Sequence, residues 1–377
     1  MNTKKNTNPK WFLMIVSMLV SAVLSAQPLE IRGTILDAVT QEPLPYANIV
    51  CGQEGTSSNQ DGKFILHLSK ANTNDRVSIR YIGYQSIEPT VAELIENSNI
   101  QLVSHSEVLE GVTVYSGENI IEDLINHYQI NYEFNDLLLK AYYKESIQNT
   151  SSYLYIGEGL FDIYLPTIYS EDETTVSSIK TRKKEFNGID SVQIPHVTGH
   201  VSDMVNAATR RKSSFLTMEG HKHYTFTKEE YSFYDGREIF KLHFEPKDKH
   251  GNSSGTLYVD AESKAIIKAD YYPLIENQYF WSFAHWTEEF KEIEGTWYIH
   301  RVSYEGEWID QNKVFTYHAD MVITDSKVTK STPQLSHEIS DTASFFDEAS
   351  DFGSGFWEEQ NHMLLTEEEQ LALASRQ

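Results

Sequence analysis

Apolar and polar residues alternate with a period of two along most of the chain, a pattern typical of half-buried β-strands. Ile31 and Ile35 alternate with polar neighbours, and Leu66 and Leu68 do the same further along. Six or seven short runs of this kind are separated by turn-forming residues. This spacing predicts a small β-sandwich over residues 27–116.

The alternation returns over residues 136–330, in a stretch rich in Tyr, Phe and Trp. Residues 239–244 alternate, and residues 255–260 and 265–270 form a clear hairpin pattern around a polar turn. The sequence therefore predicts a long antiparallel sheet that curves. The fold class is mainly β, with a sandwich followed by a curved sheet and a few helices.

A helical period joins the two β regions. Ile121, Leu124, Ile125 and Tyr128 fall on one helical face, which predicts a linker helix within residues 117–135.

Residues 331–377 form an acidic tail with ten Asp or Glu and one basic residue, Arg376. Thr366 followed by Glu369 predicts a capped short helix. The tail also carries Phe356 and Trp357, so we expect its aromatic residues to dock onto the sheet. A solvated acidic segment is the alternative.

The first 26 residues have the organisation of a secretory signal peptide. Lys4, Lys5 and Lys10 precede an uncharged run over residues 11–24, and Ala26 offers a cleavage point. An uncleaved N-terminal anchor is the alternative. We therefore expect an exported protein, in the periplasm or at the periplasmic face of the outer membrane, with no transmembrane helix after signal cleavage.

Composition narrows the function further. The net charge of -24 repels phosphate backbones, which argues against a nucleic-acid partner. Cys51 is the one cysteine, so neither an intrachain disulfide nor a Cys-based zinc site is expected.

Four motifs carry a resemblance to a known family. Residues 33–37 (GTILD), 42–49 (EPLPYANI), 55–64 (GTSSNQDGKF) and 81–84 (YIGY) occur in this order. Together they resemble the carboxypeptidase regulatory-like domain, a transthyretin-like sandwich of envelope proteins. The resemblance implies a recognition or scaffolding role without peptidase chemistry, often beside outer-membrane transporters. Within this domain, Tyr46 is interpreted as a packing residue.

The second unit resembles periplasmic lipoprotein carriers through the pattern of residues 255–260 followed by 266–268. That resemblance implies a half-barrel whose concave face holds an apolar ligand. The candidate ligand anchors are four tryptophans, although core packing is the favoured interpretation of them. They are Trp281, Trp286, Trp297 and Trp308.

One cluster could ligate a metal. Glu219, His221 and His223 are spaced by two, so a β-strand would present all three on one side, as a zinc or copper site requires. An exposed polar strand face gives the same spacing. The sequence contains no His-Glu-x-x-His motif, Gly-x-Ser-x-Gly elbow, phosphate loop or dinucleotide fingerprint, and no catalytic residue or cofactor is assigned.

These observations favour a non-catalytic exported envelope protein that binds an envelope protein partner or a lipid or other apolar ligand. Two alternatives stay open: a metal-dependent hydrolase, or a structural accessory of an outer-membrane transport assembly. A membrane-embedded second unit is disfavoured by strands with charges on both faces. The oligomeric state is not indicated.

Overall fold

The computed structural model describes residues 29–375, apart from residues 71, 106–114, 117, 134, 168–169, 171, 210–214, 275–279, 337, 340–348, 353–355 and 361. The predicted signal peptide lies outside the described residues. No described helix is long and apolar enough to span a membrane.

The N-terminal unit is the predicted sandwich of two small sheets. One sheet has the order β4-β1-β6 and the other β3-β2-β5. Ile35, Ile49 and Phe64 are fully buried between the sheets, as the alternation requires. The elements are β1 (Leu29–Asp37), β2 (Asn48–Cys51), β3 (Glu54–Ser57), β4 (Lys63–Leu68), β5 (Ser78–Arg80), α2 (Val91–Glu96) and β6 (Asn99–Leu102).

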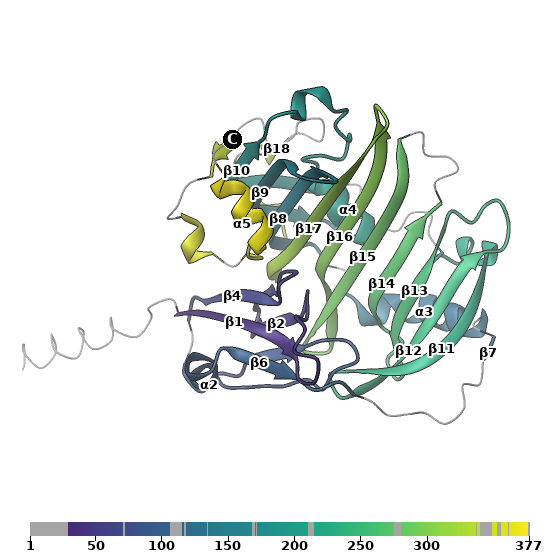
Figure 1. The fold of residues 1–377 in the computed structure, drawn as a ribbon. Helices are drawn as coiled ribbons and strands as arrows, with labels where there is room; N and C mark the ends of the chain where they lie inside the picture. The colour runs from purple at the N-terminus through teal and green to yellow at the C-terminus, as the bar shows by residue number, and fades with distance from the viewer. Residues whose placement is uncertain are drawn as a thin grey trace, which may run out of the picture.

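A sheet of thirteen strands makes up the second unit, with the order β18-β10-β9-β8-β17-β16-β15-β14-β13-β12-β11-β7 and β19 beside β10. It is open, and β18 and β7 stand at its two ends in the described structure (Figure 1). Its pairs are antiparallel except for β10 with β19. The strands are β7 (Tyr115–Ser116), β8 (Leu137–Asn149), β9 (Tyr153–Leu165), β10 (Thr175–Glu185), β11 (Tyr224–Tyr234), β12 (Arg237–Pro246), β13 (Ser253–Asp260), β14 (Ile266–Pro273), β15 (Trp281–Ile293), β16 (Thr296–Asp310), β17 (Lys313–Val328), β18 (Glu338–Ile339) and β19 (Ser350–Asp351).

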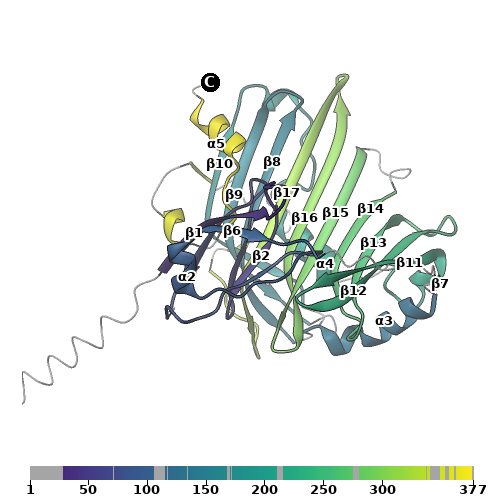
Figure 2. The same cartoon turned by 60° about the horizontal axis from the view of Figure 1, so that its bottom comes forward.

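The two faces of the large sheet differ in polarity. On β17, Tyr317 and Met321 join the main core, and helices α3 (Glu118–Asn131) and α4 (Val201–Thr209) cover this apolar face. Successive side chains point to opposite faces of a strand, so His318 and Asp320 lie on the other side. The sandwich packs against that polar face (Figures 1 and 2). The predicted apolar face of α3 is confirmed, because Ile121 and Leu124 are buried in the core.

Polar contacts join the sandwich to the sheet. Ser57 lies 3.1 Å from the Nε2 atom of His300, and Arg80 pairs with Asp235 at 2.9 Å. The Gly83 N–H donates to the carbonyl of Phe233. Hydrogen bonds and an ion pair of this kind hold the two units in one arrangement.

The acidic tail packs at the same interface between the sandwich and the sheet. Trp357, in η5 (Phe356–Glu359), is buried against Tyr142, Leu160 and Val322, which confirms the predicted docking for this residue. Helix α5 (Glu367–Ala374) begins with the predicted capping box, in which Thr366 and Glu369 satisfy each other's backbone N–H groups.

Trp308→Ala is expected to lower the free energy of unfolding by about 3–5 kcal/mol, because the side chain is 1% exposed and its removal leaves a cavity. Ile309→Ala, at an adjacent residue that is 63% exposed, should change it by less than about 0.5 kcal/mol. Urea unfolding measures both. Equal effects of the two variants would contradict the packing described here.

Lys291 gives a second prediction, because it is fully buried on β15. Burial lowers its pKa to about 8 from the ordinary 10.5, against the opposing charge of Asp325. The unfolded chain therefore binds this proton more tightly, and the free energy of unfolding gains a contribution that rises with pH between these two values. Lys291→Met should remove that rise and stabilise the protein at pH 7 by about 1–4 kcal/mol.

The control for Lys291→Met is Lys313→Met, at an exposed position on β17. Unfolding in urea at pH 7 and pH 9.5 should separate the two variants. A Lys291→Met protein that keeps the wild-type slope with pH would show that the amine is not held in a dry site.

Candidate binding cleft between the sandwich and the sheet

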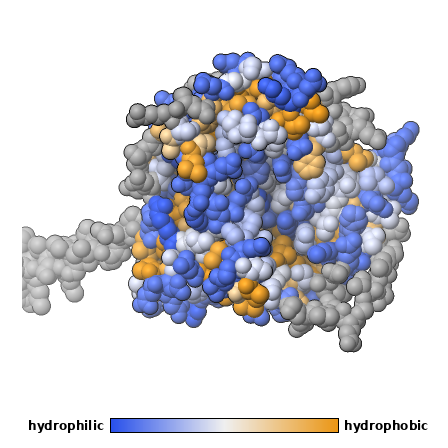
Figure 3. Space-filling model, viewed as in Figure 1, coloured by the Kyte–Doolittle hydropathy of each residue, from blue (hydrophilic) through white to orange (hydrophobic). Residues whose placement is uncertain are grey.

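A cleft of about 580 Å³ lies where the sandwich, the polar face of the sheet and α5 meet. Its volume falls in the range of pockets that hold small ligands. Tyr46 and Tyr81 come from the sandwich, Lys268 and Arg301 from the sheet, and Glu369 from α5. Hydrophilic residues cover much of the middle of this face of the molecule (Figure 3). The cleft is therefore built jointly by parts of the chain that are far apart in sequence.

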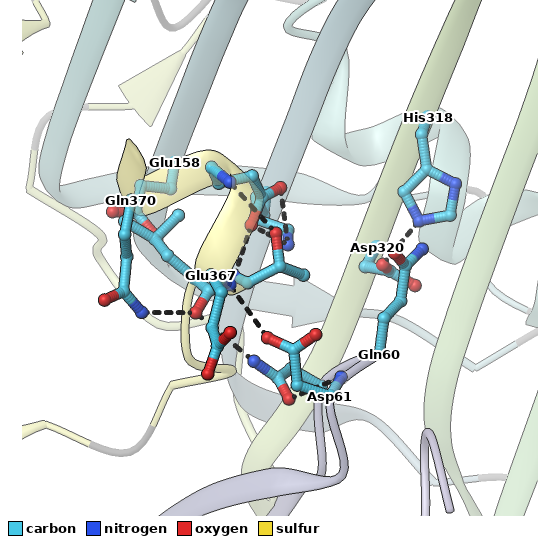
Figure 4. A network of polar contacts seen from close by, with 12 residues as sticks. Gln60, Asp61, Glu158, His318, Asp320, Glu367 and Gln370 are labelled. Carbon is cyan, nitrogen blue, oxygen red and sulfur yellow. Dashed lines mark hydrogen bonds and ion pairs between the residues drawn. The ribbon is translucent and has the colours of Figure 1, made fainter. Parts of the chain in front are cut away.

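Arg301 forms the floor of the cleft. It is 3% exposed, and its guanidinium lies 2.9 Å from Asp320 and 3.3 Å from Glu289. Asp320 also accepts a hydrogen bond from His318 at 2.7 Å (Figure 4). Burial alone would raise the pKa of Asp320, but His318 and Arg301 outweigh it and hold the pKa well below its ordinary value. The network thus keeps a fixed, internally neutralised charge at the base of the cleft.

Tyr46 covers this floor from the sandwich side. Its ring centroid lies 3.6 Å from the Arg301 guanidinium carbon, a cation–π contact. Its backbone has φ of 62°, the left-handed region that is costly for a bulky side chain. Gln60 donates to its hydroxyl at 3.1 Å. A strained backbone that the surrounding contacts hold in place is a feature that clusters at functional sites.

A second charged group lies on β14 and β15. His285 hydrogen bonds to Asp270, and Lys268 lies 3.3 Å from the same carboxylate. Burial alone would raise the pKa of Asp270. The hydrogen bond from His285 and the charge of Lys268 outweigh burial, so the pKa lies below its ordinary value. The Lys268 ammonium also lies 5.6 Å from the Tyr258 ring centroid.

Helix α5 supplies the third wall. Glu369 lies 2.9 Å from the Lys144 ammonium, and both side chains are almost completely buried. Glu369 also accepts the Thr366 N–H at the start of the helix, so one carboxylate anchors α5 twice. At the first residue of the helix, the Glu367 N–H donates to Asp61 of the sandwich (Figure 4).

The positive charges that line the cleft are paired with carboxylates. The four Lys and Arg side chains that line the cleft in the described structure each have a carboxylate within 4.0 Å. Thr287, Ser303 and Ser146 also line the cleft and carry hydroxyl groups. The walls therefore present many hydrogen-bond donors and acceptors in fixed positions.

The four predicted tryptophan anchors lie on the opposite, helix-covered side of the sheet. Trp297 and Trp308 are core residues, whereas Trp281 and Trp286 are half-buried. Trp281 and Trp308 meet edge to face with ring centroids 5.7 Å apart. Trp297 is at the other end of β16, paired with Tyr132. The structure thus brings Trp281 and Trp308 into contact within packed side chains, and none of the four lines the cleft.

The predicted metal ligands do not share a face. Residues 220–223 form a 3₁₀ helix, so the prediction that a strand presents Glu219, His221 and His223 together is wrong. His221 faces Glu122 at 3.6 Å, and His223 bonds Asp248 at 2.9 Å. No group of three or more His, Cys, Asp or Glu suited to a metal occurs among the described residues.

The sequence did not identify the cleft residues as a site, and Tyr46 was interpreted as a packing residue. Tyr46 follows the rigid segment Pro43 to Pro45, and that segment is the one local signal that its position is fixed. Lys144 and Arg301 stand at strand positions where a half-buried face was expected to be polar. Their pairing across the sheet depends on strand order, which the sequence does not state.

Among the comparisons with known proteins, the match to a family model falls on the sandwich. Residues 31–114 match the CarboxypepD_reg-like domain family. No curated protein matches the chain.

Some solved structures are similar at low identity. A DUF1329 family protein from Desulfovibrio piger and a LolA superfamily protein from Nitrosomonas europaea each show 12% identity over 58% of this chain and 96% of theirs, with a TM-score of 0.29. A membrane-associated protein of unknown function from Bacteroides fragilis shows 12% identity over 80% of this chain and 99% of its own, with a TM-score of 0.17. Similarity at these TM-scores carries no argument about function.

Asp320→Asn tests the floor of the cleft, because it leaves the buried Arg301 with a weaker partner. We expect the free energy of unfolding to fall by about 3–5 kcal/mol at pH 7. The stabilisation from a carboxylate with a lowered pKa is present above its ordinary value of 3.8 and is lost as pH falls toward the folded-state pKa. The difference between the two proteins should therefore shrink below pH 4.

The control is Asp190→Asn, at an exposed residue. Urea unfolding between pH 3 and pH 7 follows all three proteins. A constant difference across this range would contradict the assigned role of the Asp320 carboxylate.

Proposed function

We propose that this chain, whose residues 31–114 form a CarboxypepD_reg-like domain, is a non-catalytic binding protein of the cell envelope. Its ligand would occupy the cleft between the sandwich, the sheet and α5. The single observation that carries the proposal is this 580 Å³ cleft, which exists only when all three parts are assembled. A pocket lined by convergent polar groups with perturbed pKa values is the physical pattern of a binding site.

The ionisable groups of the cleft support binding rather than catalysis. Asp320, Glu369 and Asp270 are each held in ion pairs or hydrogen bonds with neighbouring side chains. A general acid or base works best with a pKa near the operating pH. The pKa values of Asp320 and Asp270 are lowered away from that range.

The proposed location is the periplasm or the periplasmic face of the outer membrane. The support is the basic start and the apolar run over residues 11–24, together with the acidic remainder of the chain.

An apolar ligand on the four tryptophans is less well supported than a ligand in the cleft. Trp297 and Trp308 are 3% and 1% exposed, so such a ligand would have to open the core to reach them. The cleft needs no such opening.

An envelope protein partner is the second candidate function. The observation that favours it is the tip of the β16–β17 hairpin, where Ile309 and Val314 are 63% and 41% exposed on the face that holds the cleft. Exposed apolar residues beside a polar site suit a partner that covers the mouth.

Native mass spectrometry of residues 27–377, purified gently from the native envelope, tests the binding function. We expect an additional small-molecule mass on the wild-type protein. Thr316→Trp, which fills the cleft, should abolish that mass, whereas Lys313→Trp, on the same strand but outside the lining, should keep it. A bare polypeptide mass for all three proteins would overturn the proposal, and a large protein adduct would favour the second candidate.

A further inference from the structure

We propose that the cleft binds a neutral, polyhydroxylated ligand, a carbohydrate segment. This inference rests on the proposed binding function and assigns its ligand class. It follows from three features of the polar face of the sheet: paired charges, ordered rows of hydrogen-bonding groups, and an exposed aromatic ring at the edge of the cleft.

The first feature is that the cations of the cleft are already neutralised. Arg301 pairs with Asp320, Lys144 with Glu369 and Lys268 with Asp270. A phosphate or carboxylate ligand would have to compete with a built-in carboxylate for each of them. Breaking a buried pair leaves an uncompensated charge, which is strongly unfavourable. A neutral ligand avoids this cost and can hydrogen bond to the outer atoms of the pairs.

The second feature is a set of polar rows across the strands. In one row, the strand register places Thr287 and Ser303, which line the cleft, beside Asp320, whose buried carboxylate bonds to Arg301 and His318. In the next row, His285, Glu305 and His318 are neighbours in the same way. Strand neighbours are about 4.8 Å apart, so polar side chains recur at short, regular distances along each row. Such rows match a ligand that carries many hydroxyl groups, each able to donate and accept.

Glu305 is the central acceptor of the second row. It is half-buried between His285 and His318, whose rings are directed to Asp270 and Asp320. No Lys or Arg forms an ion pair with Glu305 in the described structure. A carboxylate in this position is available to accept hydrogen bonds from two hydroxyl groups.

The third feature is Tyr272 on β14. Its ring stacks on the His285 ring with centroids 4.5 Å apart and an interplanar angle of 12°. The residue is 43% exposed, so the ring is held flat beside the cleft while much of its surface remains open. The negative face of an aromatic ring attracts weakly positive C–H groups, and a sugar ring presents a flat array of them. Tyr272 is thus a platform at the entrance of the rows.

Ligand-observed saturation-transfer NMR tests the assignment. The probes are three neutral oligosaccharides (maltohexaose, cellohexaose and xylohexaose), the anionic hexamer of galacturonic acid, and spermine. We expect signals from at least one neutral oligosaccharide and none from spermine or the galacturonate. Silence from all three neutral probes, or binding of the charged probes alone, would overturn the carbohydrate assignment.

Variants locate the site. Tyr272→Ala and Glu305→Gln should each weaken binding of the oligosaccharide, raising its dissociation constant by about tenfold or more. Leu274→Ala, at an equally exposed residue near Tyr272, should change it by less than about twofold. Urea unfolding confirms that the variants are folded, and equal effects of all three would place the sugar elsewhere.

The two proposals fail in different ways. An adduct in native mass spectrometry that Thr316→Trp removes, combined with no oligosaccharide binding, would leave the cleft as a binding site and exclude the ligand class. No adduct together with no oligosaccharide binding would overturn both.

Discussion

A buried guanidinium organises this molecule. Arg301 lies in the middle of the large sheet, and a charge in that position is tolerated only when it is paired and hydrogen bonded. Asp320 and Glu289 supply the carboxylates from the neighbouring strands, and Tyr46 supplies an aromatic face from the sandwich. The same requirement that satisfies the charge therefore fixes three strands and the N-terminal unit relative to one another, and the cleft is the space left above this junction.

The difference in polarity between the two faces of the sheet follows from the alternation of side chains along each strand. Side chains such as Tyr317 and Met321 need apolar cover, and α3 and α4 provide it. Many of the opposite side chains are charged, and they are covered by polar loops of the sandwich and by the acidic tail, whose Trp357 also packs on an apolar cluster of this face. Polar surfaces pack through specific hydrogen bonds rather than uniform burial, and the cleft lies where the fit between these parts is incomplete.

The sequence predicted what depends on local periodicity. Alternation identified the two β units, the spacing of Ile121 and Leu124 identified α3, and Thr366 with Glu369 identified the start of α5. Helix α2 was missed, although Thr90 and Glu93 form the same kind of capping box. The cleft could not be predicted, because it depends on strand order and on the docking of distant segments. Alternation also failed for residues 219–223, where spacing by two coincides with a 3₁₀ turn.

The tail contacts have a consequence for how the protein matures. Residues 362–369 bond to residues 56–63, as in the hydrogen bonds from Thr56 to the His362 carbonyl and from Asn59 to the Leu365 carbonyl. Contacts between segments so far apart in a chain form late in folding, because their loop entropy must first be offset by other contacts. The individual sheets can therefore form before the third wall of the cleft is in place. The cleft would then be complete only in a fully folded chain, and half-folded molecules would not compete for whatever it binds.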